Sequence, residues 1–119
     1  MERGSGRHFT FDGVVKDIAI INVGNVTEFL DRCPDEIKMT KITLPNVYEI
    51  GGKIIGFIMI AESHISFHGD IYSGLVSIDV FSCMFFQYND ILLFVKKYFP
   101  CDDNYIPNFL QRGLELKRF

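Results

Sequence analysis

The sequence predicts an α+β domain, in which one mostly antiparallel sheet carries helices on one face. Three stretches indicate this class. Residues 75–83 alternate, with Val76, Ile78 and Val80 on one side of a strand and mostly polar side chains on the other. Residues 54–61 are apolar on both sides of a strand, and residues 89–99 repeat apolar side chains at helical spacing.

The N-terminal part predicts a strand, a helix and a second strand. Residues 8–11 form a short strand, whereas residues 17–24 fit no single pattern. Asn25 is a typical helix cap, and we expect the helix that it starts to end before Pro34, since the residue before a proline avoids helical geometry. Residues 40–47 then alternate loosely as a strand.

The remaining elements follow in order along the chain. The glycine pair 51–52 predicts a turn into the apolar strand 54–61, which we expect to be central in its sheet because both of its sides are apolar. The helix 89–99 should end at Pro100. Residues 105–116 predict a last strand, and the proline within it places that strand at an edge of the sheet.

Length, charge and cysteine content limit the possible functions. The chain has 119 residues, which fits one domain. Its net charge is −3 and it has no long basic block, so we expect no nucleic-acid partner. Three cysteines without C-x-x-C spacing favour a reducing cytoplasm. No apolar run approaches the ~20 residues of a membrane span, so we expect a soluble, cytoplasmic protein without membrane contact.

The stretch 61–68 carries the most informative polar residues. Alternation puts His64, Ser66 and His68 on one side of a strand. The polar side of the strand 75–83 lies beside them if the two strands pair. A serine, two histidines, an aspartate and a cysteine would then converge.

Three interpretations of this cluster remain open from the residues alone. The histidines are satisfied polar side chains on a half-exposed sheet, or His64 and His68 bind a metal together with Asp79 or Cys83. In the third interpretation, Ser63 or Cys83 is a nucleophile that works with a histidine.

The order and spacing of these residues resemble a known family. Glu62-Ser63-His64, followed by His68 and by the run Asp79-Val80-Phe81-Ser82-Cys83, is similar to the S-adenosylmethionine decarboxylases of the short prokaryotic type. Gly6-Arg7-His8 fits the same family, and the resemblance is strongest over residues 56–83. It implies a two-layer sandwich with helices on one face of the sheet, and a homodimer with shared active sites.

The resemblance also implies a single-domain proenzyme that cuts itself. The Ser63 hydroxyl would attack the Glu62 carbonyl and turn the amide into an ester, and His68 would help to remove the serine α-proton so that the ester breaks. The products would be residues 1–62, the β chain, and residues 63–119, the α chain. The α chain would begin with a covalent pyruvoyl group derived from Ser63.

The same resemblance assigns the catalytic chemistry. The pyruvoyl group forms a Schiff base with the substrate amine and accepts the electrons that decarboxylation releases, so the resemblance implies neither pyridoxal phosphate nor a metal. Cys83 would be the acid that returns a proton to the substrate carbon. Its alternative role is that of a small buried thiol.

Two positions depart from the family pattern. Tyr72 stands where the family has a glutamate that binds the ribose hydroxyls, and Ile55 stands where it has a serine. A phenol cannot supply a bidentate carboxylate, and Tyr48 is the one nearby candidate for stacking on the adenine. We expect substrate contacts from Asp70, Tyr72 and His64, although Asp70 also suits a turn.

The sequence therefore predicts a pyruvoyl-dependent carboxy-lyase of polyamine and spermidine biosynthesis, with S-adenosylmethionine as the family's usual substrate. The changes at Ile55 and Tyr72 make ornithine or arginine the alternative substrates of the same machinery. A non-catalytic regulatory homologue is a further hypothesis, and the presence of Ser63 and Cys83 argues against it.

Overall fold

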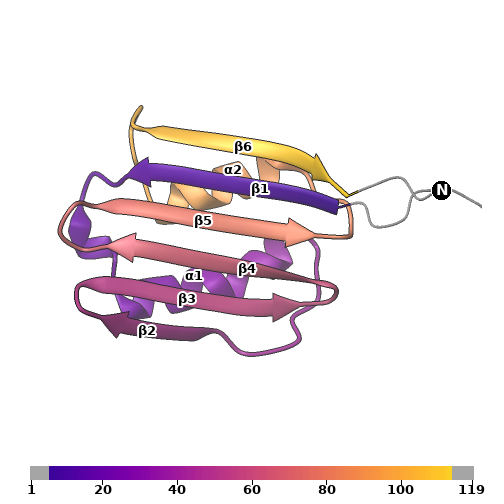
Figure 1. The fold of residues 1–119 in the computed structure, drawn as a ribbon, viewed down its shortest axis with the longest axis horizontal. Helices are drawn as coiled ribbons and strands as arrows, with labels where there is room; N and C mark the ends of the chain where they lie inside the picture. The colour runs from indigo at the N-terminus through magenta and orange to yellow at the C-terminus, as the bar shows by residue number, and fades with distance from the viewer. Residues whose placement is uncertain (1–5, 114–119) are drawn as a thin grey trace, which may run out of the picture.

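The computed structural model describes residues 6–113, which form six strands, two helices and one short 3-10 helix. The strands join in one antiparallel sheet with the order β2-β3-β4-β5-β1-β6 (Figure 1). In chain order the elements are β1 (Gly6–Val14), η1 (Ile18–Ile20), α1 (Val23–Glu36), β2 (Asn46–Ile50), β3 (Lys53–Ile60), β4 (Ser63–Asp70), β5 (Leu75–Ser82), α2 (Tyr88–Tyr98) and β6 (Tyr105–Arg112).

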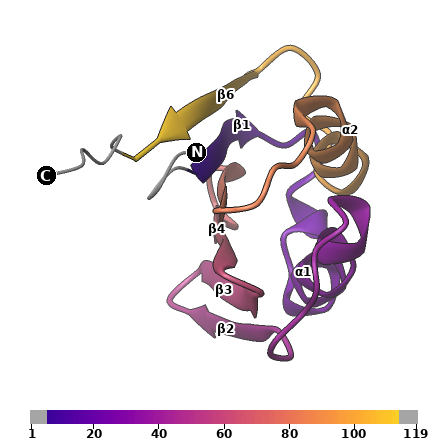
Figure 2. The ribbon, with the colours of Figure 1, turned by 90° about the vertical axis from the view of Figure 1, so that its right-hand side faces the viewer.

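Both helices pack on the same face of the sheet, so the domain has two layers (Figure 2). Alternate side chains of the strands, such as Phe9, Phe11, Ile65 and Phe67, are buried between the layers, where Phe67 meets Phe29 of α1. The predicted α+β class and two-layer architecture are confirmed. We call the face of the sheet away from the helices the open face.

Helix α1 differs from the prediction at both ends. Its cap is Asn22, whose side-chain oxygen accepts a hydrogen bond from the Asn25 backbone at 2.8 Å. The Asn25 side chain instead donates to the Ile20 carbonyl at 3.0 Å. The predicted end before Pro34 was wrong, because Pro34 lies inside the last turn, where it is buried in the core.

The second strand was predicted too early in the chain. The segment 40–45 is irregular, with only an isolated bridge between Lys41 and Ile60, and β2 begins at Asn46. Pro45 accounts for the difference, since a proline has no N–H to donate to a neighbouring strand.

Strand β3 is not central in the sheet, although its two apolar sides had suggested that it would be. It lies between the edge strand β2 and β4, and the centre of the sheet is the pair β4 and β5. Ile54, Ile58 and Ile60 face the helices and are buried, whereas Phe57 and Met59 on the open face are 44% and 47% exposed. Within one chain β3 is therefore covered on one side only.

The C-terminal elements agree with the prediction. Helix α2 buries Ile91, Phe94 and Val95, and β6 is an edge strand that pairs with β1. The last three residues of the predicted strand, 114–116, lie outside the described residues. Neither α1 nor α2 is long and apolar enough to cross a membrane, and these are the α-helices of the described region.

Candidate active site

The proposed cleavage site lies in the tight turn between β3 and β4. Ile60 and Ser63 are paired across the two strands, so Ala61 and Glu62 alone form the loop. Glu62 adopts a left-handed backbone conformation with φ of 62°. The Ser63 hydroxyl donates a hydrogen bond to the Glu62 carbonyl oxygen. The group expected to attack and the carbonyl expected to be attacked are thus in contact.

Cys83 lies beside Ser63 because β4 and β5 pair, as predicted. Ser82, the last residue of β5, is the cross-strand partner of Ser63. The Cys83 backbone N–H therefore reaches the Ser63 hydroxyl oxygen and donates to it at 3.2 Å. The Ser63 oxygen is held between two backbone groups, the Glu62 carbonyl and the Cys83 amide.

Cys83 also differs from the two other cysteines in its surroundings. Cys83 is exposed, whereas Cys33 and Cys101 are buried. Burial raises the pKa of both the Cys33 and the Cys101 thiol above the usual value. Those two thiols therefore stay protonated in the core, and Cys83 is the cysteine that a substrate can reach.

His68 does not meet Ser63 within one chain. It lies five residues further along β4, which corresponds to roughly 16 Å at the usual rise of a strand. The two residues also differ by an odd number of positions, so their side chains leave the strand on opposite faces. Within one chain Ser63 and His68 are therefore apart, whereas His64, Ser66 and His68 share one face of β4 and lie opposite the polar side of β5, as predicted.

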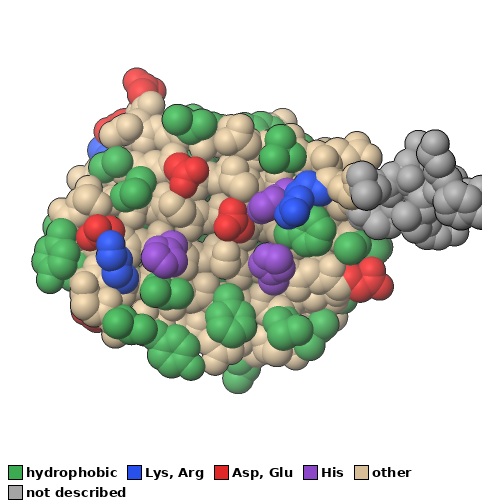
Figure 3. Space-filling model, in the orientation of Figure 1, with side chains coloured by type: hydrophobic (Ala, Val, Ile, Leu, Met, Phe, Trp, Pro, Cys, Tyr) green, Lys and Arg blue, Asp and Glu red, His purple; other side chains and the backbone are tan. Residues whose placement is uncertain are grey.

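The open face carries all three histidines, His8, His64 and His68, together with acidic and apolar side chains (Figure 3). The ring of Phe81 lies between two of them, because its centroid is 5.9 Å from that of His8 and 6.0 Å from that of His64. His64, which follows Ser63 in the sequence, thus belongs to a cluster with the Phe81 and His8 rings. The sequence indicated these side chains one by one, and the strand register shows that they are neighbours.

Two further residues fix His8, and the sequence gave no sign of this arrangement. The Arg112 guanidinium lies 3.2 Å from His8 Nδ1 and above the Phe81 ring. Because a guanidinium only donates hydrogen bonds, Nδ1 is the acceptor in this contact. Nε2 is buried and lies 3.5 Å from an Asp79 carboxylate oxygen. Arg112 belongs to the C-terminal part of the chain, outside the motif region.

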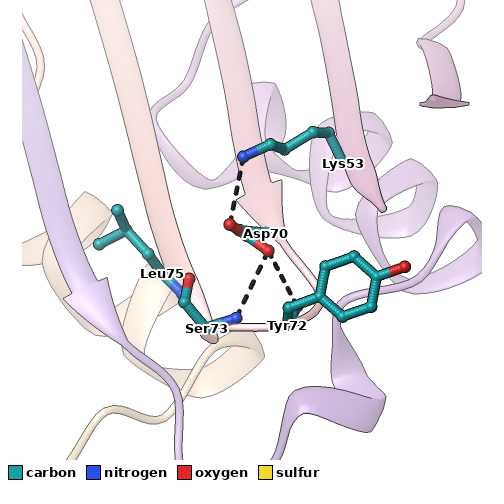
Figure 4. A network of polar contacts seen from close by, with 5 residues as sticks. All are labelled: Lys53, Asp70, Tyr72, Ser73 and Leu75. Carbon is teal, nitrogen blue, oxygen red and sulfur yellow. Dashed lines mark hydrogen bonds and ion pairs between the residues drawn. The ribbon is translucent and has the colours of Figure 1, made fainter. Parts of the chain in front are cut away.

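Asp70 is the last residue of β4, at the opposite end from Ser63, and Tyr72 follows in the turn. Figure 4 shows Asp70 with Lys53, Tyr72 and Ser73 around it. The Asp70 carboxylate accepts hydrogen bonds from the Tyr72 and Ser73 backbone at 2.8 and 3.4 Å and pairs with Lys53 at 3.1 Å. These contacts, led by the Tyr72 amide, hold the pKa of Asp70 below its usual value. The carboxylate thus has the role of a turn residue, and Tyr72 projects outward with 79% of its surface exposed.

The row of side chains next to His68 contains the second departure from the family pattern. Ile55 is the cross-strand partner of His68 on β3, and Tyr48 is the partner of Ile55 on β2. All three lie on the open face. Ile55 therefore places an apolar side chain beside His68, at the position where a serine was expected.

The residues considered as metal ligands do not gather at one point. In the described part of the chain, no group of three or more His, Cys, Asp and Glu side chains is arranged to hold a metal ion. His64 and His68 lie four positions apart along an extended strand, or about 13 Å.

Comparison with known proteins decides the family. The model of the S-adenosylmethionine decarboxylase family matches residues 8–113. The chain belongs to the S-adenosylmethionine decarboxylase family. The match extends beyond the motif region 56–83 into the C-terminal third of the chain.

A solved structure supports the fold of this family member. The crystal structure of the adenosylmethionine decarboxylase from Aquifex aeolicus VF5 superposes with a TM-score of 0.81, covers 98% of each chain and is 20% identical in sequence. At that identity the similarity shows a common fold. No curated protein matches the chain. Family membership indicates a decarboxylase.

Proposed function

We propose that this member of the S-adenosylmethionine decarboxylase family cuts itself between Glu62 and Ser63 and then acts as a pyruvoyl-dependent decarboxylase of polyamine synthesis. The observation that carries the proposal is the position of the Ser63 hydroxyl, which contacts the Glu62 carbonyl and is held by the Cys83 amide. A nucleophile that already touches its target needs little reorganisation to react.

The first step is a transfer of the Glu62 acyl group from nitrogen to oxygen. The Ser63 oxygen forms a bond to the Glu62 carbonyl carbon, the amide C–N bond breaks, and the hydroxyl proton passes to the nitrogen. The Cys83 N–H orients the oxygen, and it acts through the backbone, without the thiol.

The second step removes the α-proton of Ser63 and breaks the bond between its β-carbon and the ester oxygen. Glu62 leaves as a carboxylate, and water then releases ammonia from residue 63. His68 is the proposed base, but it lies about 16 Å from Ser63 of its own chain along β4. A second chain must then supply it.

Pairing of two open faces provides such a second chain. Ser63 is the first residue of β4, next to the turn and to the exposed Cys83, so His68 of a partner would reach it at the end of the sheet. In a two-fold dimer the contacts are reciprocal, and the opposite pair would form as well. The open face also exposes apolar side chains that a partner would bury, including Tyr48, Phe57, Met59 and Leu110. Exposed apolar patches of this kind mark interaction surfaces. The proposal is thus a homodimer with two shared sites.

Decarboxylation takes place at the same end of the sheet as self-cleavage. The pyruvoyl carbonyl supplies the electrophile that accepts the electrons left when carbon dioxide departs. Cys83 is adjacent to residue 63 and exposed, so its thiol can return a proton to the substrate carbon. His64 and the Phe81 ring form the neighbouring wall on the open face.

The direct test is the intact mass of the purified protein. We expect two chains, residues 1–62 and residues 63–119, and we expect the second to resist N-terminal sequencing because a pyruvoyl group has no free amine. Their masses would place the cut at the 62/63 bond. A chain that keeps its full mass after long incubation would contradict self-processing.

Substrate choice is a separate prediction. We expect S-adenosylmethionine, the family's usual substrate, to be decarboxylated, with ornithine and arginine as the alternatives because Tyr72 and Ile55 replace a glutamate and a serine. Release of labelled carbon dioxide from the three carboxyl-labelled compounds, measured side by side, would distinguish them. One substrate should dominate, since a site built around a polar group rejects analogues that leave it unpaired.

The Asp70→Asn variant is the control for this comparison. Asp70 is already neutralised by Lys53 and its own turn, so the order of the three substrates should stay the same. A selective loss of activity on ornithine or arginine would instead assign Asp70 to recognition of a cationic substrate end.

A further inference from the structure

Each of the three hairpins of the sheet contains a residue with a left-handed backbone conformation, but the type of residue differs. The turn between β2 and β3 uses Gly51 and Gly52, with φ of 56° and 82°, and the turn between β4 and β5 uses Gly74, with φ of 80°. Glycine adopts such angles without steric cost. In the turn between β3 and β4 the left-handed residue is Glu62, which has a side chain and lies at the proposed cleavage site.

The contacts of Glu62 do not compensate for this conformation. The side chain is exposed, and its carboxylate has no hydrogen-bond or ion-pair partner among the described residues. The turn is held by its other residues instead, because the Ala61 N–H donates to the Thr40 carbonyl at 2.9 Å and Ile60 pairs with Lys41. The hairpin thus imposes a left-handed backbone on a residue that does not favour it.

We propose that Glu62 is a positioning residue for self-cleavage and that it acts through its strained backbone rather than through its carboxylate. The inference rests on the proposed self-processing. Transfer of the acyl group to Ser63 breaks the C–N bond, forms the C–O bond and moves the hydroxyl proton to nitrogen. The path from the Glu62 carbonyl carbon to the Ser63 Cα then runs through the side chain and is one covalent bond longer.

A longer path relaxes the tightest part of the loop. The strain at Glu62 is therefore present in the amide, partly released in the ester, and fully released once residue 62 is a chain end. This difference lowers the barrier to a transfer that exchanges an amide for a less stable ester. A glycine at this position would remove the strain from the amide and so remove the advantage.

The test measures the rate constant of self-cleavage in freshly purified Glu62→Gly, Glu62→Asn and Glu62→Gln proteins. We expect Gly and Asn, which tolerate left-handed angles, to slow cleavage about fivefold, equivalent to about 1 kcal/mol. Gln keeps the strain and loses only the charge, so it should cleave at the wild-type rate. Lys38→Gly is the matched control, because Lys38 is an exposed residue with φ of 61° just after α1.

A second measurement reports the strain without cleavage. In a Ser63→Ala background, Glu62→Gly and Lys38→Gly should each raise the melting temperature by a few degrees. Wild-type cleavage rates in Glu62→Gly and Glu62→Asn, or an equal slowing in Glu62→Gln, would overturn the inference while leaving self-processing intact. A wild-type protein that never cleaves would overturn both.

Discussion

A mixture of Ser63→Ala and His68→Ala proteins should cleave at the 62/63 bond, although neither protein should do so alone. Ser63→Ala lacks the nucleophile. His68→Ala can form the ester but lacks the base, so its chain should stay joined until hydroxylamine is added. In a mixed dimer, one shared site contains the intact Ser63 of one chain and the intact His68 of the other.

The identity of the cut chain makes this experiment specific. Only chains that carry His68→Ala retain Ser63, so after coexpression with differently tagged partners the tag on that chain alone should appear in the two fragments. The double mutant Ser63→Ala/His68→Ala, mixed with His68→Ala, is the control and should give no fragments. If mixed dimers form and no chain is cut, His68 does not act across the interface.

The Cys83→Ala protein should still cut itself but should lose most of its turnover. In the proposed mechanism, self-cleavage uses the backbone N–H of residue 83, which donates to the Ser63 oxygen, and an alanine keeps that group. Turnover would use the thiol as proton donor, and loss of such a general acid typically costs about 10²-fold or more. Steady-state decarboxylation and intact mass, measured on the same preparation, would separate the two effects.

A second measurement distinguishes loss of the Cys83 proton donor from damage to the loop that contains it. Without the thiol, water protonates the wrong carbon and the substrate nitrogen stays on the protein, so the α chain should gradually acquire an N-terminal alanine. Peptide mass analysis would detect it. The neighbouring Met84→Ala, at an exposed side chain of the same loop, should keep both activity and the pyruvoyl terminus. Full activity in Cys83→Ala would remove the thiol from the mechanism.

The alternation of apolar and polar residues predicted the sheet around the site. It assigned His64, Ser66 and His68 to one face of β4 and Val76, Ile78 and Val80 to the core side of β5, as the structure shows. The strand pairing that brings Cys83 to Ser63 was also expected, because β4 and β5 are consecutive and joined by a short turn.

Several features could not be predicted because they depend on tertiary contacts. Asn22 rather than Asn25 caps α1, since Asn25 instead bonds Ile20 and Tyr98 of another helix. Pro34 stays helical because the core buries it. The contact of Arg112 with His8 joins residues from opposite ends of the chain, and no local pattern encodes such a pair.

The site itself was only partly predictable. Residue types, spacing and the family resemblance indicated Ser63, His68 and Cys83 as candidates, and the predicted strand over residues 61–68 already separates the first two. The left-handed backbone of Glu62 was not predicted, because a glutamate carries no local preference for it.

The order of the strands determines how the two fragments would be held together after a cut between residues 62 and 63. Strand β1 belongs to the first fragment, yet it lies between β5 and β6 of the second, while β3 of the first fragment borders β4 of the second. The two fragments are therefore interleaved, and separating them requires three strand interfaces to open together. A severed molecule would keep its shape as a non-covalent complex. Once denatured, it would have to reassemble in a second-order reaction, so processing would convert a domain that folds as one chain into one whose recovery depends on concentration.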